Sequence, residues 1–65
     1  MPGDDAKLSR DEARYAASLV RAEQRAKERE ATRFPAGDSS RAAFEKSAEV
    51  YRVIAEKLEL QAGEG

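Results

Sequence analysis

Two long stretches of the chain carry apolar residues at helical spacing, and a short segment containing Pro and Gly separates them. The first predicted helix covers residues 9–33 without Gly or Pro, and the second covers residues 40–62. Pro35 ends the first helix, because a residue that precedes Pro is pushed out of the α region. Gly63 is a natural stop for the second helix. The short connection, residues 34–39, predicts an antiparallel helical hairpin in the all-α class.

Capping residues support these boundaries. Ser9 and Glu12 have the spacing of a capping box, in which each side chain bonds the backbone N–H of the other. Residues able to cap the second helix are Asp38, Ser39 and Ser40. The whole chain, residues 1–65, is therefore expected to form one domain, with flexible tails at 1–8 and 63–65.

The second predicted helix is strongly amphipathic. Phe44, Tyr51 and Leu58 are seven positions apart, as in a coiled coil, and Ser47, Ile54 and Gln61 occupy the paired heptad positions. Its expected inward face is Ala43, Phe44, Ser47, Val50, Tyr51, Ile54, Ala55 and Leu58. The first helix offers a poorer face, expected to consist of Tyr15, Ala16, Leu19, Val20, Ala22 and Ala26.

An Ala-rich helix should not cover the apolar stripe of the second helix, so the leftover surface predicts a further partner. A chain of 65 residues with no Cys needs such support, because a core of this size supplies only ~3–5 kcal/mol. We expect a homo-oligomer, with a dimer favoured, in which two hairpins form a four-helix bundle. A larger protein partner is a second possibility. The predicted interface residues are Phe44, Val50, Tyr51, Ile54, Leu58, Leu19 and Val20.

This general plan, a short antiparallel hairpin that pairs into a four-helix bundle, resembles that of Rop-type proteins. The resemblance is architectural, and no functional motif matches residue by residue.

Val53 and Leu60 lie seven positions apart and away from the main stripe. They are either two isolated exposed aliphatic residues, which are common on protein surfaces, or a second contact strip used in assembly or partner binding.

The charges are nearly balanced, with 12 basic and 13 acidic residues and a net charge of -1. This balance argues against strong nucleic-acid binding. A row of arginines nevertheless follows the first helix at Arg10, Arg14, Arg21, Arg25 and Arg29. Its simpler interpretation is a solvated face with local ion pairs. The alternative is an RNA-binding hairpin dimer that contacts phosphates through Arg14, Arg21 and Arg25.

Carboxylates form two further groups. Glu45, Glu49, Glu56 and Glu59 lie on the outer face of the second helix, where they are either ordinary surface charge or a surface for a basic partner. Glu12, Glu23 and Glu30 lie near the apolar face of the first helix. Because the chain has no His or Cys, the usual ligand set of a helical-bundle metal site is incomplete. We expect no metal and no cofactor.

The sequence therefore predicts a non-catalytic protein–protein interaction module, acting as a small adaptor, regulator or inhibitor. No nucleophile and base pair is apparent without His or Cys, so we expect no enzyme activity. The polar N-terminus and the lack of a long apolar run predict neither a signal peptide nor a membrane span. The absence of Cys favours a cytoplasmic location, and the abundance of Ala and Arg suggests a bacterial or phage origin.

Overall fold

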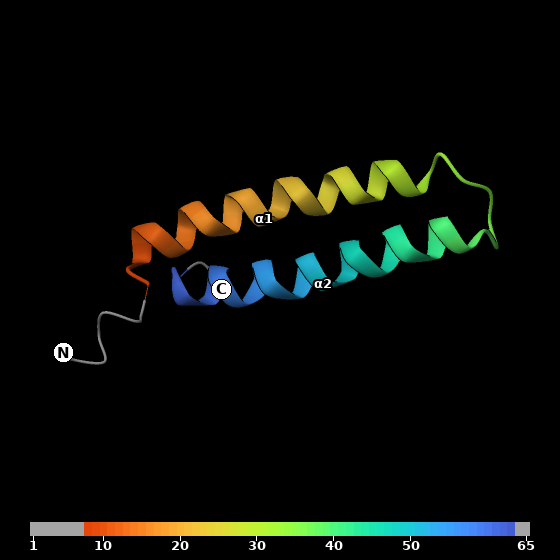
Figure 1. Cartoon of the computed structure of the whole chain (residues 1–65). Coiled ribbons are helices and arrows are strands. Elements are labelled where there is room, and N and C mark those ends of the chain that lie inside the picture. Colours follow the sequence, from red (N-terminus) through yellow and green to blue (C-terminus); the bar gives the residue numbers. More distant parts are fainter. Residues whose placement is uncertain (1–7, 64–65) are drawn as a thin grey trace.

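The computed structural model describes residues 8–63 and contains two helices, α1 (Arg10–Ala31) and α2 (Ser39–Gln61). The helices lie side by side and antiparallel, joined by one connection (Figure 1). No strand occurs among the described residues. The predicted all-α helical hairpin is thus confirmed. The tails expected at the two ends of the chain lie almost wholly outside the described residues, which exclude 1–7 and 64–65.

Side chains at the helix ends explain where each helix begins and ends. The Glu12 N–H donates to Ser9 Oγ at 3.1 Å, and the Ser9 N–H donates to Glu12 Oε1 at 2.8 Å, which confirms the capping box. The Ser40 N–H donates to Asp38 Oδ1 at 2.7 Å at the start of α2. Gly37 has a φ of +88°, a left-handed conformation that would strain a residue with a Cβ. These features close the connection tightly.

Alanine forms the buried core between the helices. The buried apolar residues are Ala13, Ala17, Ala31, Ala48, Ala55 and Ala62. On α2 these alanines recur every seventh residue, so one small side chain faces α1 in each heptad. Small side chains allow the two backbones to approach closely, but they remove little apolar area from water. No large side chain in the described part of the chain is fully buried.

The expected inward face of α2 is therefore partly wrong. Phe44, Tyr51 and Leu58 are half-buried as expected, but they alternate with the alanine positions and not with Ser47, Ile54 and Gln61. Val50 and Ile54 remain 45% and 41% exposed. The face of α2 that packs on α1 is rotated by about half a residue position, on the order of 50°, from the face that hydrophobicity alone favours. The reason is that a row of alanines permits closer helix packing than a row containing Ile and Val.

The face expected on α1 changes in the same way. Tyr15 and Leu19 are 70% and 54% exposed, whereas Val20 is half-buried between the helices.

At the connection, the rings of Phe34 and Phe44 stack with centroids 5.8 Å apart, and the Lys27 ammonium lies 5.9 Å from the Phe44 ring. This cluster closes the loop end of the hairpin.

Candidate interaction surface

One ion pair between the helices defines the two sides of the hairpin. The Arg21 guanidinium donates from Nε and Nη2 to the two carboxylate oxygens of Glu59, both at 2.8 Å. Arg21 Nη1 also donates to Gln24 Oε1 at 2.8 Å. The pair joins the flank of α1 that carries Arg21 to the flank of α2 that carries Glu59. We call the surface on which these two flanks meet the polar side.

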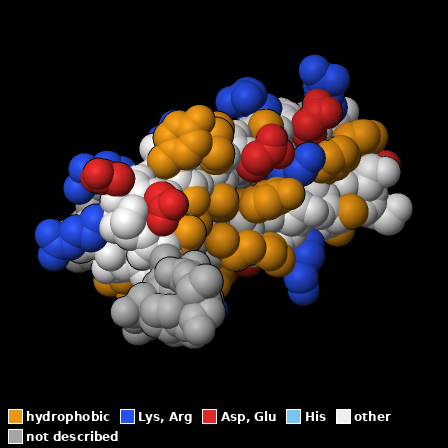
Figure 2. Space-filling model, turned by 60° about the vertical axis from the view of Figure 1, so that its left-hand side comes forward, with side chains coloured by type: hydrophobic (Ala, Val, Ile, Leu, Met, Phe, Trp, Pro, Cys, Tyr) orange, Lys and Arg blue, Asp and Glu red, His pale blue; other side chains and the backbone are white. Residues whose placement is uncertain are grey.

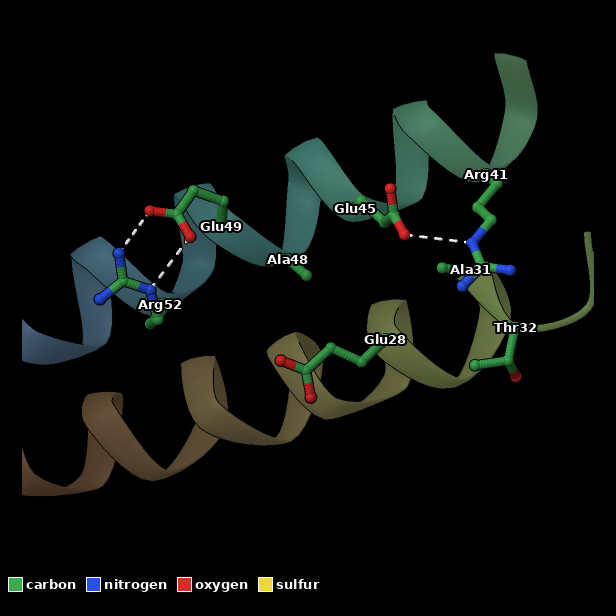
Figure 3. Close-up of a pocket in the computed structure, with 8 residues that line it drawn as sticks. All are labelled: Glu28, Ala31, Thr32, Arg41, Glu45, Ala48, Glu49 and Arg52. Atoms are coloured by element: carbon green, nitrogen blue, oxygen red, sulfur yellow. Dashed lines mark hydrogen bonds and ion pairs between the residues drawn. The ribbon is translucent and has the colours of Figure 1, made fainter. Parts of the chain in front are cut away.

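Further ion pairs continue along α2 on the polar side. Arg41 Nε donates to Glu45 at 3.1 Å, and Arg52 bridges Glu49 and Glu56, with its bond to Glu56 measuring 2.6 Å. These pairs surround a groove lined by Glu28, Ala31, Thr32, Arg41, Glu45, Ala48, Glu49 and Arg52 (Figure 3). Its volume of about 270 Å³ lies just under the ~300–1,000 Å³ typical of ligand pockets.

The ion pairs shift the pKa values of the groups that form them. The hydrogen bonds from Arg21 lower the pKa of the Glu59 carboxyl from its ordinary value of 4.5, and those from Arg52 lower the pKa of Glu49 in the same way. The same bonds raise the pKa of both guanidinium groups. The charges of the polar side are therefore largely neutralised within one hairpin.

The opposite surface of the hairpin is apolar. At ~100° per residue, Leu19 lies on the flank of α1 away from Arg21, and Val50 and Ile54 lie on the flank of α2 away from Glu59. Because the Arg21–Glu59 pair joins the other two flanks, these three side chains share one surface, with Tyr15 at its edge. We call this surface, defined by Tyr15, Leu19, Val50 and Ile54, the apolar side. Figure 2 shows hydrophobic side chains gathered over both helices on one such face.

Charged side chains of opposite sign lie on the two helices at the apolar side. The α1 carboxylates lie between Leu19 and the contact with α2, and the α2 lysines lie at the outer edge beyond Val50. The α1 flank carries the carboxylates of Glu12, Glu23 and Glu30, as the sequence predicts. Glu12 belongs to the capping box, and Glu30 pairs with Arg33 at 3.1 Å. The α2 border carries Lys46 and Lys57 and no carboxylate. Within residues 8–63, no ion pair involves Glu23, Lys46 or Lys57.

The other predicted site residues are dispersed. Val53 is half-buried and Leu60 is 67% exposed, and both lie on the surface of α2 away from the apolar side. Of the arginine row, Arg14 and Arg25 are exposed, whereas Arg21 is held by Glu59 and Gln24. Phe44, Tyr51, Leu58 and Val20 contribute to the interface within the hairpin, while Leu19, Val50 and Ile54 face outward.

No protein family, no curated protein and no solved structure matches this chain. None of the helices in the described part of the chain combines the length and apolar character needed to cross a bilayer. The fold and the surface chemistry of the hairpin are therefore the basis for a functional proposal.

Proposed function

We propose that the chain is a non-catalytic protein–protein interaction module that associates through its apolar side, first of all with a second copy of itself. The supporting observation is the exposure of Leu19, Val50 and Ile54 on one surface, at 54%, 45% and 41%. Aliphatic side chains scattered singly over a surface need no explanation, but a cluster shared by two helices is typical of an interaction site.

The energy available from this surface sets the expected affinity. Complete burial of an exposed Leu, Val or Ile gains ~1.5–3 kcal/mol, so each half-exposed side chain retains about 1 kcal/mol. A symmetric dimer buries each of these side chains twice. Association costs at least ~4 kcal/mol in lost translational and rotational freedom. The three aliphatic side chains of each copy thus supply about 6 kcal/mol to a dimer, which exceeds the cost of association by only about 2 kcal/mol, so the affinity also depends on the contacts around them. We expect this dimer to form a four-helix bundle, with larger adaptor or inhibitor complexes built on the same surface.

The alternative proposal, an RNA-binding dimer, has less support. Arg21 lies at the centre of the predicted phosphate-binding row, yet both edges of its guanidinium already bond Glu59 and Gln24. A phosphate would have to displace the bidentate Glu59 carboxylate from the Arg21 guanidinium. We favour protein association for this reason.

The direct test replaces an anchor of the apolar side with a charge. Ile54→Glu should convert the dimer to a monomer, because a carboxylate would be desolvated at the centre of the contact. The mass is measured by light scattering after size exclusion, with circular dichroism to verify that the hairpin remains helical.

Ala42→Glu is the matched control, since it introduces the same acidic side chain at an exposed position of the same helix outside the apolar side. Its mass should equal that of the unaltered chain. An Ile54→Glu variant that keeps both the native mass and the native helicity would contradict the proposal.

A further inference from the structure

We infer that the second copy packs with its α2 over the α1 of the first copy, so that both connections lie at the same end of the four-helix bundle. This inference rests on the self-association proposed above and adds its geometry. In this arrangement Glu23 of each copy faces Lys57 of the other.

Two symmetric arrangements bring the apolar sides of two hairpins together. A two-fold axis parallel to the helices places α1 over α2 of the second copy, with the connections at the same end. A two-fold axis across the helices places α1 over α1 and α2 over α2, with the connections at opposite ends. Both are closed dimers with antiparallel neighbouring helices.

The charged side chains that lie within and beside the apolar side distinguish the two arrangements. The α1 flank carries Glu12, Glu23 and Glu30, whereas the α2 border carries Lys46 and Lys57. Placing α1 over α1 brings carboxylates toward carboxylates and leaves the lysines facing lysines. Placing α1 over α2 brings opposite signs together. Like charges across an interface are unfavourable, and complementary charges fix orientation.

The register of the hairpin brings one such pair to the same height. Arg21 and Glu59 mark a common level, because their side chains are directly bonded. Glu23 and Lys57 each lie two residues nearer the connection, and therefore share the next level along the hairpin. A two-fold axis parallel to the helices preserves height. It thus sets Glu23 of one copy opposite Lys57 of the other, and neither has an ion-pair partner within residues 8–63.

The same register matches apolar side chains. Ala26 and Ile54 share one level, since each lies five residues nearer the connection than Arg21 and Glu59. In the dimer, the large Ile54 side chain of one copy would therefore lie opposite the small Ala26 side chain of the other. Leu19 would lie within one helical turn of Leu58 in the other copy. Two helices ~33 Å long and ~10 Å wide give each hairpin a contact face of about 660 Å². Two copies then bury about 1,300 Å², which reaches the ~1,200 Å² lower limit of stable interfaces.

A spin label at the connection measures the orientation directly. The chain contains no Cys, so Ala36→Cys, at an exposed position in the connection, gives one label per copy. Connections at the same end place the labels on neighbouring sides of the bundle, within about 30 Å given helix axes ~10 Å apart. Connections at opposite ends separate them by more than the helix length of ~33 Å.

The outcomes separate this inference from the proposed function. A short Ala36 distance supports the inferred orientation. A dimer with a long distance overturns the orientation but leaves self-association intact. A second experiment mixes a chain labelled at Ala36→Cys with a chain labelled at Asp11→Cys, which lies at the far end of the hairpin. A short distance between these two labels would also overturn the inferred orientation. A monomer at millimolar concentration contradicts both the inference and the self-association on which it rests.

Charge reversal provides a second test, because the two arrangements predict opposite changes of the dimer Kd. Glu23→Lys should raise the dimer Kd about three- to tenfold in the inferred arrangement, because it sets two lysines opposite each other. Lys57→Glu should act alike, and the variant carrying both changes should recover the original Kd. If α1 lies over α1, Glu23→Lys relieves repulsion and lowers the Kd, a result that would overturn the inference. The thermal melt of each variant monitors the hairpin itself.

Discussion

The two sides of the hairpin differ in whether a single chain completes their interactions. On the polar side, the charged groups find partners within the hairpin, through Arg21–Glu59 and the Arg52 bridge between Glu49 and Glu56. On the apolar side, Leu19, Val50 and Ile54 remain about half exposed, and Glu23 and Lys57 have no ion-pair partner in the described part of the chain. A single copy thus pairs the charges of the polar side, whereas it leaves the aliphatic side chains of the apolar side exposed to solvent.

This contrast shows how a broad apolar stripe can serve two contacts. The stripe of α2 is wider than one neighbouring helix covers. The alanine positions take the contact with α1, and the larger aliphatic residues on the adjacent flank are left for an external contact. Since a core of alanines buries little area, the hairpin alone is expected to be only marginally stable. Association would then contribute to folding as well as to function.

The largest effect is expected from widening the interface between the helices. Ala55 is 0% exposed, so Ala55→Leu must separate the helices or strain their side chains, at a cost of ~1–3 kcal/mol. The melting temperature should fall by about 5–20 °C in a thermal melt followed by circular dichroism.

Ala42→Leu is the matched control, because Ala42 is exposed on the same helix. This variant should melt within a few degrees of the unaltered chain. Equal melting of Ala55→Leu and the unaltered chain would show that the alanine contact is looser than the structure indicates.

Much of the hairpin could be predicted from the sequence, because its signals are local. The Ser9 capping box, the break before Pro35 and the helical periodicity each depend on neighbouring residues. The structure confirms the capping box and the two helices, although α1 ends at Ala31, two residues before the predicted end at residue 33. The leftover apolar surface was also predictable, since α1 lacks enough large apolar residues to cover α2.

The rotation of the helices was harder to predict. Hydrophobicity gives Ala little weight, so the predicted inward face included Val50 and Ile54 and, of the buried alanines of α2, only Ala55, while Ala48 and Ala62 were missed. The seven-residue spacing of Ala48, Ala55 and Ala62 was the available signal. The Arg21–Glu59 pair depends on the register between the helices, which neither helix specifies alone.

A smaller effect is expected when acid breaks the ion pairs of the polar side. Because Arg21 and Arg52 lower the pKa of Glu59 and Glu49, these carboxylates stabilise the folded state above the ordinary pKa of 4.5. That stability is lost as the pH falls through the lowered values. The melting temperature should be nearly constant between about pH 6 and 8 and should fall below about pH 4.5.

Glu59→Gln should reduce this dependence on pH by removing one of the two carboxylates. Glu28→Gln is the control, because Glu28 accepts a hydrogen bond from the neutral Gln24 amide at 2.9 Å. Identical pH profiles for Glu59→Gln and the unaltered chain would mean that the pair with Arg21 contributes little in solution.

The smallest effect is expected when RNA is added, because we expect the chain to bind it weakly or not at all. With Arg21 held by Glu59 and a net charge of -1, the chain should bind structured RNA weakly or not at all at low salt. A fluorescence anisotropy titration at low and moderate salt measures this. Binding that weakens steeply with salt and disappears in Arg25→Glu would favour the alternative function.

The most direct test of the account is the mass of the unaltered chain in solution, measured by light scattering over concentrations from about 10 µM to 1 mM. The apolar side predicts a helical species that approaches twice the chain mass with increasing concentration. A helical species that keeps the mass of one chain throughout this range would contradict the central claim that a second copy covers the apolar side.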